Sequence, residues 1–290
     1  MSREHAFIAA LRAVATTPGA RGLADDAALL EVGGETLVLT HDMLIAGVHF
    51  LNEQDPADVA WKLVATNVSD LAAKGAEPVG ALLGYQLGAD DARFLEGLNE
   101  ALTHYRMPLL GGDTVGGAGP QAMGLTAIGR ATHRPVPARS GAQAGDEVWM
   151  TGAVGAAMLG LEALRTGSGD SSAYRRPQAR LAEGLALAPL VSAMMDISDG
   201  LLLDAMRMGE ASGTTLSLSS AAIPIAAPES RRAEALRWGD DYELLFTVPA
   251  GTAIPVPATC IGTVLPFTSA ALLLDGQPLA TTDTAGYQHN

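Results

Sequence analysis

The sequence is poor in cysteine and lysine, and each shortage excludes a kind of site. Its 290 residues contain a single cysteine, Cys260, so it can form neither an intramolecular disulfide nor a metal site of several thiolates. We therefore expect a reducing, cytoplasmic environment. The only two lysines, Lys62 and Lys74, do not follow glycine. The glycine-rich phosphate-binding loop that ends in Gly-Lys-Ser/Thr is therefore absent.

Positive charge and long apolar runs are also scarce. The chain has 18 basic and 32 acidic residues and a net charge of −14, which disfavours nucleic acid and anionic membranes as partners. No run of about 18 apolar residues could span a bilayer, and Glu4 stands where a secretory signal would have an apolar core. We expect an intracellular protein with small-molecule partners, and an anionic substrate would need metal ions as intermediaries.

Aspartates are abundant in short clusters rich in glycine, serine or threonine. Each cluster alone has a simpler explanation, such as a turn, a helix cap or a solvated helix face. Carboxylates that converge on one point repel each other unless a cation lies between them, and hard oxygen ligands favour Mg²⁺. The pattern as a whole therefore predicts a metal-bridged phosphate site. The aspartates are Asp25, Asp26, Asp42, Asp70, Asp113, Asp196 and Asp199.

The order of apolar and turn-forming segments predicts a two-domain α/β protein, because 290 residues with 48% hydrophobic content can bury more than one core. Asp55-Pro56 is typical of a helix start and Gly75 of a helix end. Pro135 and Pro137 indicate a domain boundary. Predicted helices cover 7–14, 55–75, 90–105, a stretch ending near 165, a stretch between 177 and 189, and one from 201 that Ser198 would cap. Predicted strands cover 36–40, with Asp42 at its end, then 79–87, 123–130, 148–151 and 194–196.

Eight motifs in order give the chain a resemblance to the thiamine-monophosphate kinase family, from about residue 20 to the C-terminus. The most specific is Asn-Val-Ser-Asp-Leu-Ala-Ala-Lys-Gly-Ala-Glu-Pro at 67–78, because of its length. The others lie at 22–28, 40–50, 111–114, 139–142, 174–177, 196–201 and 241–246.

This resemblance implies the fold of the aminoimidazole-ribonucleotide synthetase superfamily. An N-terminal α/β domain (1–138) would bind ATP and metal and dimerise through its sheet, and a C-terminal α/β domain (139–290) would fold over it. The implied activity is the transfer of phosphate from ATP to thiamine monophosphate, giving thiamine diphosphate, directly and in line, with several Mg²⁺ ions. The implied assembly is a homodimer.

The resemblance also implies a role for each matching residue. All seven aspartates would be metal ligands, and Asp70 and Asp199 would also be catalytic. The residues near ATP would be Thr40, Gly112, Asp113, Arg139 and Ser198, and those near the thiamine moiety would be His49, Asp240 and Tyr287.

The chain departs from the family pattern at three places. Ala24 replaces a glycine, so we expect the turn there to be made with φ below zero or with some strain. His41 replaces a threonine beside Asp42, where a neutral imidazole could ligate. Asp240 replaces a glutamate, which shortens the reach of the carboxylate by about 1.5 Å.

Alternative functions remain open at this level. A cyclo-ligase or a selenophosphate synthetase-like enzyme of the same superfamily would share the aspartates, although the latter typically needs a reactive cysteine near the N-terminus. A non-enzymatic maturation scaffold would need a C-terminal cysteine, and the tail here is Gly-Tyr-Gln-His-Asn. The strands of the first domain are apolar on both faces, which independently predicts that a second copy covers the outer face.

Overall fold

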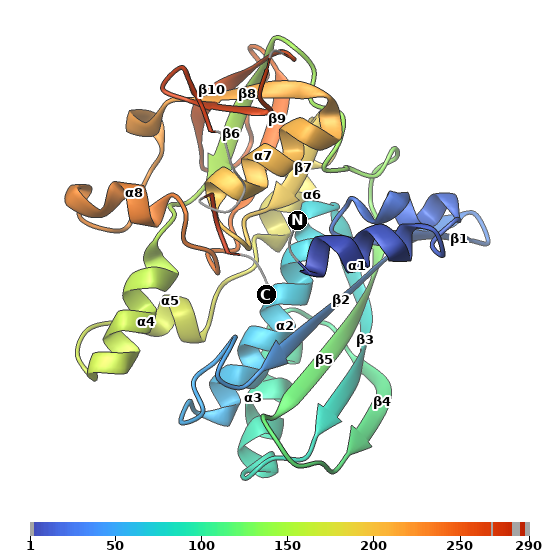
Figure 1. Ribbon diagram of the computed structural model, residues 1–290. Coiled ribbons are helices and arrows are strands. Elements are labelled where there is room, and N and C mark those ends of the chain that lie inside the picture. Colours follow the sequence, from blue (N-terminus) through green and yellow to red (C-terminus); the bar gives the residue numbers. More distant parts are fainter. Residues whose placement is uncertain (1–2, 268, 280–284, 288–290) are drawn as a thin grey trace.

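The computed structural model describes residues 3–267, 269–279 and 285–287, and these form two β-sheets with helices between and around them (Figure 1). None of the helices in these ranges is long and apolar enough to cross a membrane. The helices are α1 (Arg3–Arg12), α2 (Pro56–Ala73), α3 (Asp91–His104), α4 (Ala156–Thr166), α5 (Ser172–Arg175), α6 (Leu181–Leu187), α7 (Leu201–Ser212) and α8 (Arg232–Ala235).

The first sheet has five strands in the order β1-β2-β5-β3-β4, and the second has seven in the order β12-β11-β8-β10-β6-β9-β7. The two-sheet architecture confirms the predicted α/β fold class. The first sheet comprises β1 (Ala28–Val32), β2 (Glu35–Ile45), β3 (Ala76–Gln86), β4 (Leu109–Val115) and β5 (Ala122–Ala131). The second comprises β6 (Asp146–Thr151), β7 (Ala193–Asp196), β8 (Thr214–Leu218), β9 (Leu244–Pro249), β10 (Ala258–Pro266), β11 (Leu272–Leu274) and β12 (Gln277–Pro278).

Helix α2 is the central element, because it packs against the first sheet on one side and against α6 and β7 on the other (Figure 1). Asp55 caps it by accepting a hydrogen bond from the Ala57 N–H at 2.9 Å, and Pro56 occupies the first turn, as predicted. Every residue from Ala57 to Ala73 is buried. The interpretation of Asn67 and Asp70 as a solvated helix face is therefore wrong.

The end of α2 requires glycine. Gly75 has φ +56°, and a Cβ there would lie 2.3 Å from the Cβ of Ala188, so a larger residue would be both strained and crowded. The sharp turn lets the chain enter β3 directly while α6 packs close to the helix end.

Alternation along β2 determines which side chains can reach α2, because successive residues of a strand point to opposite faces. Val38, Thr40 and Leu44 are buried toward α2. The opposite side, here called the open face, carries Leu30, Met43 and Leu82, which are 50%, 53% and 42% exposed. We predicted that both faces of the first sheet are buried. In the part of the chain that the structure describes, this holds only for the face toward α2.

Four local predictions differ from the structure. Strand β2 continues to Ile45, so Asp42 lies within the strand and not at its end. The Gly111-Gly112-Asp113 segment is part of β4 rather than a turn. Ser198 does not cap α7, whose N-cap is Gly200 without a side-chain cap bond. The predicted apolar side of the first helix is not buried, since Phe7 is 64% and Val14 79% exposed. Helix α1 packs on the short 3-10 helix Pro18–Leu23, and this contact leaves Phe7 and Val14 exposed.

Candidate active site

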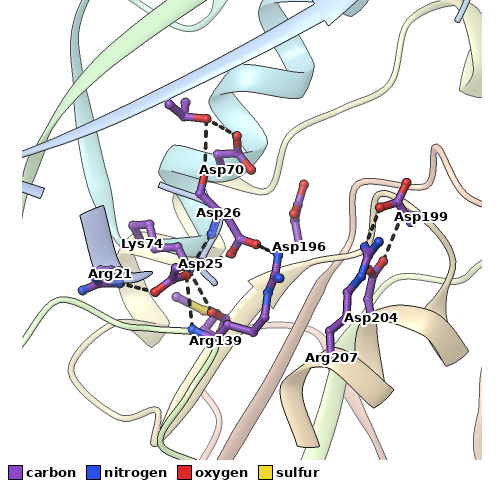
Figure 2. Close-up of polar contacts among 12 residues, drawn as sticks. Arg21, Asp25, Asp26, Asp70, Lys74, Arg139, Asp196, Asp199, Asp204 and Arg207 are labelled. Carbon is purple, nitrogen blue, oxygen red and sulfur yellow. Dashed lines mark hydrogen bonds and ion pairs between the residues drawn. The ribbon is translucent and has the colours of Figure 1, made fainter. Parts of the chain in front are cut away.

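Three aspartates from distant parts of the sequence meet where α2 joins the two sheets. The carboxylates of Asp26, Asp70 and Asp196 offer ligand oxygens that all lie within 4.8 Å of one another. Asp26 precedes β1, Asp70 lies on α2, and Asp196 ends β7 of the second sheet (Figure 2). We call these three residues the aspartate cluster. It joins the two halves of the chain at one point.

Neighbouring hydroxyls orient two members of the aspartate cluster. Thr40, on the α2 side of β2, donates a short hydrogen bond to Oδ2 of Asp70. Ser69 donates to Oδ2 of Asp196 at 2.6 Å, across the boundary between the two sheets. Asn67, one helical turn from Asp70, accepts from the Asp42 N–H at 3.1 Å. The motif at 67–78 is therefore hydrogen-bonded to β2 through Asn67 and to β7 through Ser69.

Burial and mutual repulsion raise the pKa of several of these acids. Burial is the largest cause for Asp70 and Asp196, whose pKa values lie well above 3.8, and neighbouring aspartates add to it. Burial also raises the pKa of Asp42, against a hydrogen bond with Thr66. Burial and neighbouring carboxylates thus outweigh the groups that lower these pKa values, and a bound cation would lower them.

Asp26 behaves in the opposite way because two cations contact it. Burial by itself would raise its pKa, but Lys74 and Arg139 outweigh burial and hold the pKa below the ordinary range. The Lys74 Nζ lies 2.6 Å from Asp26 and 2.5 Å from Asp25, and Arg139 Nη2 lies 2.5 Å from Asp26. Arg21 also contacts Asp25, at 2.5 Å. Both oxygens of Asp25 thus contact cations, and its role as a metal ligand stays a prediction.

The turn before α7 holds a second group of charges (Figure 2). Asp199 Oδ2 lies 2.5 Å from Nη1 of Arg207, and the same nitrogen lies 2.9 Å from Oδ1 of Asp204. Asp204 is fully buried, and burial raises its pKa to about 7 although Arg207 opposes the rise. The charge of Asp199 adds to the rise of the Asp42 pKa, and the charge of Asp42 adds to that of the Asp70 pKa, so these carboxylates interact.

Two of the three predicted thiamine-binding residues, His49 and Asp240, contact Lys62. Its Nζ lies 2.8 Å from Oδ2 of Asp240, 3.1 Å from the carbonyl oxygen of His49 and 4.0 Å from the centroid of the Tyr174 ring. Asp240 has φ +67°, an uncommon conformation for a residue with a side chain and one that often occurs at functional sites. Lys62 offsets the charge of Asp240, which the sequence did not indicate.

Tyr287 approaches the site from the C-terminal end of the chain. Its N–H donates to the carbonyl oxygen of Asp199 at 2.9 Å, and its side chain is 46% exposed. This contact places it beside the turn before α7. Asp240 is near as well, because its N–H donates to the carbonyl oxygen of Ser198 at 2.8 Å. The three predicted residues Ser198, Asp240 and Tyr287 are thus neighbours.

Asp113, a predicted metal ligand, and His41, which could ligate a metal, lie apart from the aspartate cluster. Asp113 is on the edge strand β4, three strands from β2, or about 14 Å at 4.8 Å per strand. The strand register pairs Asp113 with Gly84, Gly84 with Gly124, and Gly124 with Met43. Paired residues point to the same side of a sheet, so Asp113 lies on the open face with Met43. His41 also lies on the open face, with Nδ1 2.8 Å from Thr126 Oγ1, and points away from the side of β2 that carries Asp42.

The turn at Ala24 is made without glycine, as expected. Ala24 has φ −123°, in the allowed region for any residue, and the left-handed conformations fall on Arg21, Gly22 and Leu23 before it. Gly112 has φ +156°, and a Cβ there would lie 1.9 Å from the carbonyl oxygen of Leu83. Glycine is therefore required at Gly112 for steric reasons, whatever its role toward ATP.

Four residues of the site were missed from the sequence: Lys62, Lys74, Asp204 and Arg207. The signal for the lysines was present, because two lysines in 290 residues that both lie in one apolar helix must find buried partners. Asp204 and Arg207 are three residues apart and so face each other on α7. Nothing local to them indicates that they reach back to Asp199.

The aspartate cluster has the chemistry of a Mg²⁺ site. Its donors are hard carboxylate oxygens from three elements, and burial, together with repulsion from neighbouring carboxylates, raises the pKa values of Asp70 and Asp196. A divalent cation would relieve that repulsion, so these residues fit the ion. Asp26 adds a carboxylate that Lys74 and Arg139 keep ionised.

The fold and this cluster define the class of AIR synthase related proteins. Their N-terminal domain model matches residues 24–131 and their C-terminal domain model matches 143–265. Thiamine-monophosphate kinases from Escherichia coli (strain K12) and Caulobacter vibrioides are both 37% identical to this chain. The matches cover 92% and 81% of this chain and 91% and 73% of theirs. The chain therefore belongs to the thiamine-monophosphate kinase family.

Solved structures agree with this membership. AaThiL complexed with AMPPCP and TMP superimposes with a TM-score of 0.86 at 28% identity, over 96% of this chain and 95% of that chain. Thiamine-monophosphate kinase from Stenotrophomonas maltophilia K279a gives 0.77 at 32% identity, over 93% and 95%. Hydrogenase maturation protein HypE gives 0.71 at 18% identity, over 86% and 88%, a likeness of fold alone.

Proposed function

We propose that this protein is a thiamine-monophosphate kinase that uses ATP and Mg²⁺ to convert thiamine monophosphate to thiamine diphosphate. The observation that carries the proposal is the aspartate cluster, built from both sheets in a chain without a phosphate-binding-loop lysine. Two relatives support the substrates: the Escherichia coli kinase at 37% identity and the AaThiL complex with AMPPCP and TMP. The alternatives within the superfamily lack comparable support.

The acceptor chemistry explains why carboxylates suffice. A phosphate monoester is already nucleophilic near neutral pH, and the main barrier is its repulsion from the ATP phosphates. Bound Mg²⁺ would neutralise that charge and hold donor and acceptor in line. Asp26, Asp70 and Asp196 would hold the ions, with Asp42 and Asp199 at the border of the cluster. Thr40 and Ser69 orient Asp70 and Asp196 for this task.

The remaining predicted roles divide between the two substrates. Thr40, Gly112, Arg139 and Ser198 would lie near ATP, and His49, Asp240 and Tyr287 near the thiamine moiety. Asp113 on the open face could join the same ions only if ATP or a second copy extended the site across the sheet. We keep Asp25 as a proposed ligand, although its two oxygens contact Arg21 and Lys74.

We also propose a homodimer that forms through the open face. Leu30, Met43, Leu82, Leu110 and Val115 are all between 42% and 56% exposed on strands β1 to β4, and exposed apolar patches of this kind mark interaction sites. The domain boundary would fall at 138/139, in the connection between β5 and β6, and the compartment would be the cytoplasm.

Light scattering at micromolar concentration tests the dimer. The wild type should be a dimer, and Leu82→Asp should be a monomer. The control is Leu95→Asp, at an exposed position of α3, which should remain a dimer. A monomeric wild type would contradict the interface.

Release of ADP tests the activity. We expect turnover with thiamine monophosphate and none with aminoimidazole precursors, loss of turnover in excess chelator, and weak ATP binding without Mg²⁺. Asp70→Asn should reduce kcat by about 10²–10⁴, because it removes one ligand from a shared ion. The matched control is Asp91→Asn on α3, which should keep full activity. Wild-type turnover in excess chelator would refute the metal mechanism.

A further inference from the structure

Asp204 and Arg207 have no role in the reaction described so far, yet they are built into the site. Asp204 is fully buried in the first turn of α7, and the Arg207 side chain one turn later is 26% exposed. A buried acid of this kind is costly unless its oxygens are bonded. Both of its oxygens are bonded, and both bonds lead toward Asp199 (Figure 2).

The two bonds hold Asp199 at separate points. Oδ2 of Asp204 accepts from the Asp199 N–H at 3.0 Å and so fixes its backbone. Oδ1 accepts from Arg207 Nη1 at 2.9 Å, and the same nitrogen lies 2.5 Å from Asp199 Oδ2. Asp204 therefore acts on the Asp199 backbone directly and on its carboxylate through Arg207.

The carbonyl group of Asp199 is fixed as well. The Asp199 carbonyl oxygen accepts from the Tyr287 N–H at 2.9 Å. Gly200 follows with φ +112°, and a Cβ there would lie 2.5 Å from the Arg237 carbonyl oxygen. With its backbone fixed on both sides, the main freedom left to Asp199 is rotation of its carboxylate. Arg207 restricts that rotation through Oδ2 and does not use Oδ1.

We propose that Asp204 and Arg207 are positioning residues that hold Asp199 with Oδ1 available to a Mg²⁺–nucleotide complex. The inference rests on the proposed function, because it takes Asp199 as a ligand. It assigns to the pair an effect on the binding of metal and nucleotide and none on the acceptor. Outer carboxylates that orient metal ligands typically change metal affinity by 10- to 100-fold when they are mutated.

The test compares Asp204→Asn and Arg207→Gln with Arg231→Gln as the control. Arg231 also bridges two acids, Glu162 at 2.7 Å and Glu234 at 2.5 Å, and its side chain is 27% exposed, but it lies on the surface away from Asp199. Asn at position 204 keeps one acceptor but turns an NH₂ group toward Arg207 or the Asp199 N–H, so one bond is lost.

Titration calorimetry of AMPPCP at a series of Mg²⁺ concentrations gives a readout without turnover. For both variants we expect the Mg²⁺ concentration at half-maximal AMPPCP affinity to rise about 10- to 100-fold. Arg231→Gln should match the wild type. Arg207→Lys, which keeps a cation near Oδ2, should recover part of the loss. In steady-state assays the KM for thiamine monophosphate should change less than twofold.

Variants that bind AMPPCP with the wild-type Mg²⁺ dependence would overturn the inference, even if their melting temperatures fell, because the pair would then be purely structural. An equal rise in the KM for the acceptor would overturn it too. The calorimetry needs no acceptor, so it decides this inference even if the ADP assay shows that thiamine monophosphate is not the substrate.

Discussion

Replacement of Lys74 by methionine tests the charge balance of the site most directly. Lys74 is fully buried at the end of α2 and contacts Asp25 at 2.5 Å and Asp26 at 2.6 Å. Methionine has a similar length and is apolar, so Lys74→Met removes the charge with little change in packing. Two buried carboxylates then lose one of their cations, while Arg21 and Arg139 remain.

The expected loss of stability follows from this geometry. Removal of one partner from a buried ion pair typically costs 3–5 kcal/mol, and we expect the lower end, about 3 kcal/mol, because the arginines stay. For a chain of this size a loss of 1 kcal/mol lowers Tm by about 2–4 °C. The variant should therefore melt about 6–12 °C below the wild type at pH 7.5.

The pH dependence has a definite sign. Despite burial, Lys74 and Arg139 hold the pKa of Asp26 below its value in the unfolded chain, which is about 3.9. A lowered pKa contributes stability that is present above pH 3.9 and is lost as the pH falls toward the folded value. In Lys74→Met this contribution shrinks. The Tm gap between variant and wild type should thus be nearly constant above pH 5 and should narrow as the pH falls below about 4.

Differential scanning calorimetry from about pH 2.5 to 8, with and without Mg²⁺, measures these effects. Mg²⁺ should raise the Tm of Lys74→Met more than that of the wild type, because the ion replaces lost positive charge beside Asp26. The control is Lys62→Met, a second buried lysine whose partner Asp240 is 29% exposed and can be hydrated. Its Tm should not respond to Mg²⁺ beyond the wild-type response. A Lys74→Met protein with the wild-type Tm at pH 7.5, or a Tm gap that does not narrow below pH 4, would refute the reasoning.

Three further predictions concern other parts of the molecule. Burial raises the pKa of Asp241 from 3.8 to about 7, although the N–H groups of Gly155 and Ala157 donate hydrogen bonds to it. Ionised Asp241 therefore lowers the stability of the folded protein increasingly as the pH rises from about 4 to 7. Above pH 7 the loss reaches about 4 kcal/mol. Asp241→Asn should therefore gain stability relative to wild type between pH 5 and 8 in urea titrations, and parallel curves would contradict this. Gly112→Ala should lose about 3 kcal/mol through the clash with Leu83, whereas Gly116→Ala, with nothing within 4 Å, should be neutral by the same measurement. Asp240→Asn, which preserves the side-chain volume beside Lys62, should raise the KM for thiamine monophosphate by about 5- to 150-fold, or 1–3 kcal/mol, and an equal shift in the KM for ATP would place Asp240 with the metal ligands instead.

The sequence by itself predicted the bounds of α2 and a site built from carboxylates, but it did not indicate β1, β4 or the strands that follow α7. Asp55-Pro56 and Gly75 bounded α2 correctly because a cap, a first-turn proline and a positive-φ glycine act within a few residues. The absence of a Gly-Lys-Ser/Thr loop, together with the repeated aspartates, predicted carboxylates rather than lysine at the phosphates. Residue types decide which ions a site can hold, and these are visible without coordinates.

Only the tertiary structure decided which aspartates meet. Strand alternation and α2 packing brought Asp70 beside Asp26 and Asp196, while the register of β4 placed Asp113 on the open face. The contacts of Lys74 with Asp25 and Asp26 span 49 and 48 residues, and that of Lys62 with Asp240 spans 178. No local pattern encodes such pairs, because they arise when two sheets close on one buried helix and each buried charge must find its partner there.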